Sequence, residues 1–221
     1  MKDWYLRNKY ILDRFEGLFL KNTVLVQGLL IAPVVVAANT VKKALILSLM
    51  FFAVTFLTVV LARFIPRKLM YAVRVVLYTV ISSLLFIPLA MLVNRFWPGV
   101  LESAGIYLPL LVTNSLIVSK IQTRFLPQRF FPMLTDLTAH LFGAVAVMLI
   151  LSAVREMFGN ATFFGIPLMF VTRRMPILML PFGGFILVGL AAAAIAKINH
   201  KIEKYQQIPA AEQLESPNEP K

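Results

Sequence analysis

Cysteine is absent from the 221-residue chain, and charged residues make up only 14% of it. Without a thiol, the chain supplies no disulfide, no thiolate ligand for zinc or an iron–sulfur cluster, and no cysteine nucleophile. Soluble domains average about 25% charged residues, so this chain has too little polar surface to cover a water-soluble globule. Hydrophobic residues reach 59%, and the composition therefore favours one polytopic membrane domain.

Catalytic signatures are also missing from the sequence. It contains no nucleophile–base constellation, no phosphate-binding loop and no dinucleotide fingerprint. The pair Gly183-Gly184 lacks the third glycine and the preceding strand that a nucleotide site requires. The sequence therefore identifies no catalytic residues, and at most it describes a subunit of a larger enzyme.

Long apolar runs predict six transmembrane helices, because a hydrocarbon core about 30 Å thick needs roughly 20 apolar residues. Two of the runs are short and interrupted by proline and polar residues. We expect an all-α membrane protein, since lipid accepts only helices or closed barrels and the alternating pattern of barrel strands is absent. The predicted spans are residues 24–38, 44–62, 75–93, 104–119, 134–154 and 176–196.

Two segments of different character flank the membrane domain, which we place at residues 23–200. Residues 1–22 interleave apolar and basic side chains at helical spacing, which predicts an amphipathic helix in the membrane interface. Residues 201–221 are rich in Gln, Glu and Pro, which predicts a disordered tail. Placing both termini in the cytoplasm puts 16 basic residues inside and 6 outside, as the positive-inside rule requires.

The spans follow the order short, long, long, and then repeat it. A half with three spans must enter its second copy from the opposite face, so the order predicts a 3+3 inverted-topology repeat with two short broken helices. In such folds the interrupted segments meet near the midplane and form a site, and here they carry Gln27, Asn114 and Ser115. Alternatively, the short spans are ordinary tilted helices and the symmetry is accidental.

Five segments support a family resemblance. They are KNTVLVQGLLIAP from Lys21, RFIPRKL from Arg63, FWPGVLESAGIYLPLLVTNS from Phe96, REMFGNATFFG from Arg155 and LPFGGFILVG from Leu180. In this order they resemble the small six-span subunits of the Rnf and Nqr ion-translocating oxidoreductases, the E subunit of Rnf and the D subunit of Nqr. The resemblance implies a location in the prokaryotic plasma (inner) membrane. It also implies partner membrane subunits, one of them a homologous six-span subunit related by a pseudo-twofold axis.

The resembling family has a cysteine in each short span, and these hold an iron–sulfur cluster that passes electrons between flavins while ions move. In this chain the two cysteine positions fall on Ala32 and Ser115. Alanine has no ligand atom, and a serine hydroxyl is a poor replacement for a thiolate. The family's glycine-rich run after Asp136 also keeps only Gly143. We therefore expect a divergent member that binds no cofactor or metal by itself, with flavins and iron–sulfur clusters in partner subunits.

Two ionisable residues lie near the start of the fifth span, where they are candidates for a polar site or an ion path. We expect the Asp136 carboxylate to contact water near the membrane surface or to pair with Arg124 or Arg129. His140 lies one turn further on the same helix face, which predicts a satisfied polar pair. A proton relay or a metal site is the alternative, although a metal would need further ligands.

Arg155 and Glu156 lie at the other end of the fifth span and are candidates of the same kind. Our preferred interpretation is a surface ion pair that anchors the helix end. The alternative is an ion entrance on the outer face.

Three functional hypotheses follow. The leading one is a membrane subunit of an Rnf/Nqr-like ion-translocating electron-transport complex, serving as scaffold or ion path without a cluster of its own. The second is a small membrane transporter, or the substrate-binding component of one, lined by Gln27, Asn114, Ser115 and His140. The third is a structural or regulatory membrane protein.

Overall fold

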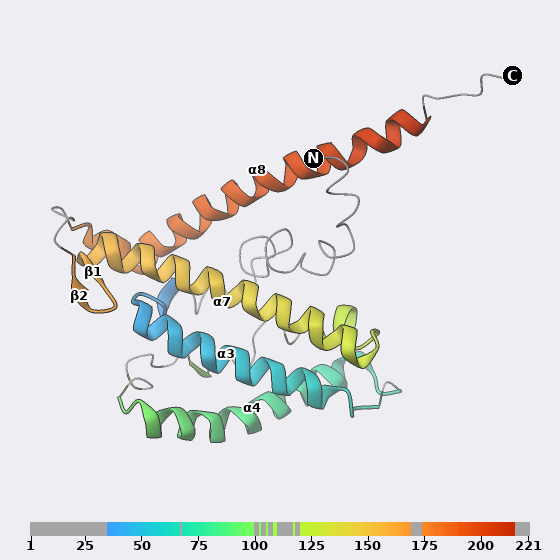
Figure 1. Ribbon diagram of the computed structural model, residues 1–221. Helices are drawn as coiled ribbons and strands as arrows, with labels where there is room; N and C mark the ends of the chain where they lie inside the picture. The colour runs from blue at the N-terminus through green and yellow to red at the C-terminus, as the bar shows by residue number, and fades with distance from the viewer. Residues whose placement is uncertain are drawn as a thin grey trace, which may run out of the picture.

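The computed structural model is predominantly helical (Figure 1). The structure describes residues 35–66, 68–99, 102, 105, 108–109, 117, 120–168 and 174–214. At residues 198 and 201–214 it describes the backbone alone.

Three helices are long and apolar enough to cross a membrane: α3 (Val41–Ala62), α4 (Tyr71–Phe96) and α7 (Phe130–Asn160). At about 1.5 Å per residue they measure roughly 33, 39 and 46 Å, so each exceeds the hydrocarbon thickness of about 30 Å. The predicted spans 44–62, 75–93 and 134–154 lie inside them. Apolar composition and length therefore predicted these elements correctly, and the chain is a multi-pass membrane protein.

Helix α3 lies between α4 and α7 (Figure 1). Its start is capped by Thr40, whose Oγ1 accepts a hydrogen bond from the Lys43 N–H at 3.4 Å. Apolar side chains such as Leu47 and Phe51 on α3 and Leu137 and Met148 on α7 are fully buried and belong to one core. Tight packing of these two helices fixes both ends of α7 relative to the start and end of α3.

Helix α4 differs from its neighbours because most of its surface is uncovered. Its buried residues are Tyr78, Ser82 and Val93, which lie on the side facing α3. Large apolar side chains such as Leu84 and Met91 are 64% and 72% exposed. In a membrane protein such a face meets lipid or another subunit.

The sixth predicted span, residues 176–196, is not one continuous helix. It begins with the 3-10 turn η4 (Pro176–Met179), and α8 (Pro181–Leu214) starts after Leu180. Proline is favoured in the first turn of a helix because its missing N–H has no partner to lose there. The apolar part of α8, Pro181–Lys197, is shorter than the other candidate spans.

The backbone of α8 is described as far as Leu214. The disordered tail expected for residues 201–221 stays a prediction.

A two-stranded hairpin follows α7 and departs from the all-α prediction. Strands β1 (Thr162–Phe163) and β2 (Ile166–Pro167) pair antiparallel. The connecting residues Phe164 and Gly165 both have positive φ values, 57° and 85°, which is the geometry of a type I′ turn. Ala161 has a φ of 56° and ends α7 in the left-handed conformation, so three such residues reverse the chain within a short distance.

The N-terminal interfacial helix at residues 1–22 and most of the spans 24–38 and 104–119 fall outside the described residues. The six membrane-spanning helices and the inverted repeat therefore stay predictions. The structure shows a mostly helical membrane protein with three apolar helices long enough to span a membrane.

Candidate functional site

The charged side chains of α7 lie toward its two ends. At the basic end, where α3 ends and α4 and α7 begin, we define the Asp136 cluster as Arg124, Gln128, Asp136 and His140. At the hairpin end, where α3 begins and α7 ends, we define the Arg155 cluster as Arg155 and Glu156 with the backbone groups that they bind. All four candidate polar or ion-path residues of α7 belong to one or the other cluster.

Asp136 is bound by two side chains from the segment that precedes α7. Arg124 donates through Nε to Oδ2 at 2.7 Å and through Nη2 to Oδ1 at 2.8 Å. The Gln128 amide donates to Oδ2 at 3.1 Å. The predicted pairing of Asp136 with Arg124 is thus confirmed in a bidentate form, which is the strongest arrangement for these groups. The alternative partner, Arg129, lies at the start of α7 with an exposed side chain.

A local distortion of the backbone places Arg124 opposite Asp136. Residues Ile121–Phe125 form one turn of π-helix, η3, which closes with a hydrogen bond from the Leu126 N–H to the Ile121 carbonyl at 2.9 Å. Arg63, just after α3, donates to the Gln128 carbonyl at 3.2 Å. Short π-helical turns are common at functional positions, and here the turn connects the ends of three elements.

His140 is fully buried one turn beyond Asp136. Its Nδ1 lies 2.9 Å from the Asp136 carbonyl oxygen and 3.4 Å from Oδ1, and the Phe125 ring meets it edge-on. The predicted pair therefore forms through one ring nitrogen, whereas Nε2 is buried without a hydrogen-bond partner among the described residues. Within that same part of the chain, no three His, Asp or Glu side chains gather closely enough to hold a metal ion.

Breaking the Asp136–Arg124 pair is expected to destabilise the basic end. Asp136→Asn should lower the free energy of unfolding by about 1–3 kcal/mol, because hydrogen bonds to a charged partner contribute more than neutral ones. The measurement is a double-mutant cycle with Arg124→Gln, followed by unfolding in detergent. Arg129→Gln serves as the matched control, since its side chain is exposed. Equal coupling of Asp136 to both arginines would contradict the assignment.

Among the described residues, Arg155 is the largest fully buried side chain, with 1% of its surface exposed. Within that part of the chain its guanidinium donates to backbone carbonyls alone, which come from two separate segments. Nε donates to Leu178 at 2.9 Å and Nη2 to Met179 at 3.0 Å, and Nη2 also reaches Leu180 at 3.5 Å. Nη1 donates to Val35 and, at 3.2 Å, to Ala38. One side chain thus joins the turn before α8 to the segment before α3.

Glu156 is equally buried, at 2% exposure, and binds a different set of backbone groups. Its Oε2 accepts from the Val41 N–H at 2.7 Å, at the start of α3. Its Oε1 accepts from the Gly165 N–H at 2.8 Å and from the Thr162 hydroxyl at 3.2 Å. A carboxylate at a helix N-terminus is stabilised by the free N–H groups there. Glu156 therefore holds both the first turn of α3 and the hairpin.

The predicted surface ion pair between Arg155 and Glu156 is wrong, because both side chains are buried and they bind other groups. Arg155 donates to backbone carbonyls, whereas Glu156 accepts from two backbone N–H groups and from the Thr162 hydroxyl. Adjacent residues on a helix point in different directions, so the two reach separate targets. Five acceptors around Arg155 and three donors around Glu156 already use their hydrogen-bonding capacity. The arrangement clamps three segments together and offers little for an ion entrance.

Closely packed glycines surround the Arg155 cluster, and they could not be recognised as such from the sequence. A Cβ on Gly183 would lie 2.3 Å from the Ile177 carbonyl oxygen, and one on Gly184 would lie 3.3 Å from Cζ of Arg155. On Gly159 it would lie 2.6 Å from the Met179 sulfur. The signal was the glycine pair directly after Pro181-Phe182, which marks a close backbone approach as readily as a nucleotide loop.

The candidate midplane residues Gln27, Asn114 and Ser115, and the position Ala32, fall outside the described residues. The site predicted from the interrupted spans therefore stays a prediction.

Comparison with known proteins gives one consistent family. The model described as Rnf-Nqr subunit, membrane protein, matches residues 10–196. A curated protein of Escherichia fergusonii, described as the E subunit of an ion-translocating oxidoreductase complex, is 29% identical over 219 residues, covering 89% of this chain and 94% of the relative. The proteins of the same description from Erwinia tasmaniensis and Haemophilus ducreyi are each 28% identical, over 213 and 200 residues. The alignments cover 90% and 84% of this chain, and 91% and 88% of the two relatives.

Proposed function

Because the chain belongs to the Rnf-Nqr family of membrane-protein subunits, we propose that it is an integral membrane subunit of an ion-translocating electron-transport complex. The observation that carries this proposal is the extent of the match, which includes both polar clusters and all three span-length helices. Relatives at 28–29% identity are described as the E subunit of an ion-translocating oxidoreductase complex. Partner membrane subunits follow from membership in such an assembly.

Within the complex we assign this chain the role of scaffold. Its charged residues in α7 are satisfied inside the chain, Asp136 by Arg124 and Gln128, and Arg155 and Glu156 by backbone. Charges held this way stabilise a defined arrangement of helices rather than exchange ions with solvent. His140 is the exception, because its Nε2 has no partner within the described part of the chain. It is therefore the α7 residue that best suits an ion or proton path.

The residues of this chain do not fit an iron–sulfur cluster. Such clusters are held by cysteine thiolates, with histidine as an occasional substitute, and the chain has no cysteine. Ala32 and Ser115 occupy the positions where the resembling family has its ligands. We therefore place flavins and iron–sulfur clusters in partner subunits and derive no electron-transfer step through this chain.

The proposal extends to topology. We propose six spans in an inverted 3+3 repeat, an interfacial helix at residues 1–22, and both termini on the cytoplasmic side of a prokaryotic plasma membrane. The excess of basic residues that this orientation places inside supports it. We also propose that a homologous six-span subunit packs against this chain around a pseudo-twofold axis.

Co-purification tests membership in the complex. A tagged full-length chain, extracted from native membranes in mild detergent, should elute with other membrane subunits and with bound flavin in constant ratio. Protein composition by mass spectrometry and flavin content by absorbance are the measurements. Asp136→Asn/Arg124→Gln is the informative variant, since a looser basic end should reduce recovery of partners relative to Arg129→Gln.

Two outcomes would overturn the proposal. The first is a chain that elutes alone, without partner proteins, from membranes in which the candidate partners are present. The second is solute transport by the purified chain alone in liposomes, which would favour the small transporter instead.

A further inference from the structure

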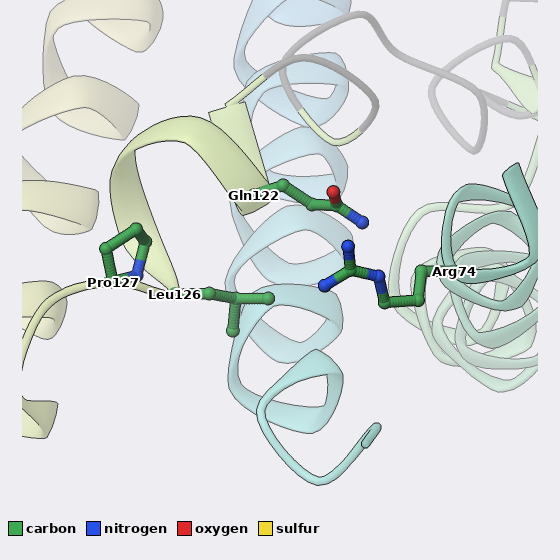
Figure 2. A pocket seen from close by; sticks show the side chains of 4 residues that line it. All are labelled: Arg74, Gln122, Leu126 and Pro127. Carbon is green, nitrogen blue, oxygen red and sulfur yellow. The ribbon is translucent and has the colours of Figure 1, made fainter. Parts of the chain in front are cut away.

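A small cavity opens at the basic end between the start of α4 and the π-helical turn η3. It has a volume of about 130 Å³ and is lined by Arg74, Gln122, Leu126 and Pro127 (Figure 2). Cavities that take drug-sized ligands or cofactors run from about 300 to 1,000 Å³. This one suits a compact group, such as a single phosphate.

The polar groups at the cavity are hydrogen-bond donors that converge. Figure 2 shows the Arg74 guanidinium and the Gln122 amide pointing toward one another across the opening. The Arg74 Nε is buried and has no hydrogen-bond partner among the described residues. The Gln122 amide donates to the Tyr78 hydroxyl at 3.2 Å, which leaves its second N–H for another acceptor. An anionic oxygen ligand would satisfy both groups.

The surroundings of Arg74 identify the source of that anion. Arg74 lies in the first turn of α4, at the end of the bundle that also carries Arg63 and Arg124. Because α4 crosses the membrane from there, its first turn lies at headgroup depth. Guanidinium groups bind phosphate through paired hydrogen bonds, and basic pockets between transmembrane helices hold lipid headgroups.

An apolar stripe runs along the uncovered face of α4 and begins at the same end of the helix as the cavity, about a third of a turn around the helix from Arg74. It consists of side chains at helical spacing that are 45–72% exposed, namely Val73, Val76, Val80, Leu84, Ile87 and Met91. At about 1.5 Å per residue the stripe is roughly 27 Å long, close to the hydrocarbon thickness of about 30 Å. A phosphate site and an apolar stripe that begin at the same end of α4 suit a phospholipid whose acyl chains reach around the helix from the phosphate and lie along the stripe.

We propose that this cavity binds the phosphate of an anionic phospholipid, with Arg74 as the main contact and Gln122 as the second donor. The lipid's acyl chains cover the α4 stripe between Val73 and Met91. The proposal does not depend on the role of the chain in an electron-transport complex. The cavity adjoins the Asp136 cluster, because Gln122 and Arg124 belong to the same turn η3, but none of its lining residues is a member of either polar cluster.

Lipid titration of the purified full-length chain tests this site. Native mass spectrometry and thermal unfolding in detergent would compare phosphatidylglycerol with phosphatidylcholine, and inorganic phosphate would serve as the probe for a free anion. We expect phosphatidylglycerol to bind in preference, and Arg74→Gln to weaken that binding about tenfold or more, since charge-assisted hydrogen bonds to phosphate are lost. Arg95→Gln, an exposed arginine at the other end of α4, should leave binding unchanged.

Arg74→Lys keeps the charge and checks that any loss reflects recognition rather than misfolding. It should unfold like the parent chain without lipid, while binding phosphatidylglycerol with intermediate strength. Equal binding of the two lipids, or undiminished binding by Arg74→Gln, would overturn the proposal. So would an equal shift with inorganic phosphate, which would make it a free-anion site. Loss of lipid binding when the complex assembles would show that a partner subunit covers the cavity instead.

Discussion

Arg155→Leu is expected to lower the free energy of unfolding by about 3–5 kcal/mol, the largest effect of any substitution considered. The change removes a buried cation and leaves five backbone carbonyls without their donor. Removing one side of a buried charged network costs more than the net value of the network, because the remaining polar groups stay desolvated. Denaturant unfolding of the detergent-solubilised chain, followed by circular dichroism, is the measurement.

Two further variants make this result specific to the clamp. Arg155→Lys should recover part of the loss, since an ammonium has three donors but lacks the planar fork that reaches both segments. Arg95→Leu removes an exposed arginine and should change stability by less than about 0.5 kcal/mol. Wild-type stability of Arg155→Leu would show that the carbonyls find water and that the clamp contributes little.

Gly183→Ala is expected to destabilise the chain by about 3 kcal/mol, at the upper end of the usual range for overpacking. A Cβ there would lie 2.3 Å from the Ile177 carbonyl oxygen and 2.7 Å from the Leu178 Cα. Both contacts are with backbone, so no side-chain rotation relieves them. The turn η4 would have to move away from α8, and the carbonyls that bind Arg155 would move with it.

Gly189→Ala is the matched control, because it lies in the same helix and a Cβ there meets nothing within 4 Å. That substitution should be neutral or stabilise by up to about 1 kcal/mol, since alanine is the better helix former. Melting temperatures of the two variants in the same detergent give the comparison. Equal effects at the two positions would mean that the approach of η4 to α8 is not tight in the membrane.

The long helices could be predicted from the sequence because one physical requirement decides them. A run of about 20 apolar residues must be helical to satisfy its backbone in lipid, and the spans 44–62, 75–93 and 134–154 all lie within observed helices. The exact ends of these helices were harder to predict, because caps and surface turns depend on local contacts. The sequence of Ile121–Phe125 contains no pattern that predicts a π-helical turn.

The Asp136–Arg124 pair could be predicted from the sequence, whereas the contacts of Arg155 could not. The difference lies in how far apart in the sequence the bonded residues are. Asp136 and Arg124 are 12 residues apart, with basic residues crowded on that side of the span. Arg155 instead reaches carbonyls that are 117 and 23 residues away. A carbonyl is present at every residue, so the sequence carries no mark of which ones an arginine will meet. Burial of both Arg155 and Glu156 also contradicts the usual rule that charges at a helix end are exposed.

The hairpin at Thr162–Pro167 was not predicted from the sequence. It depends on Phe164 at a φ of 57°, a conformation that non-glycine residues seldom adopt. Its formation is set by neighbours in space, which local propensity does not contain.

The iron content of the intact complex tests the central claim most directly, that this chain is a subunit without a cluster of its own. Ser115→Ala removes the one side-chain oxygen at the two positions where the resembling family has thiolates. Iron and acid-labile sulfide per complex, measured after anaerobic purification, should be the same for wild type and variant. A cysteine-to-serine change in a cluster-bearing partner should lower both values and prove the sensitivity of the assay. Loss of iron in Ser115→Ala would contradict the account, because it would make this chain a cluster ligand.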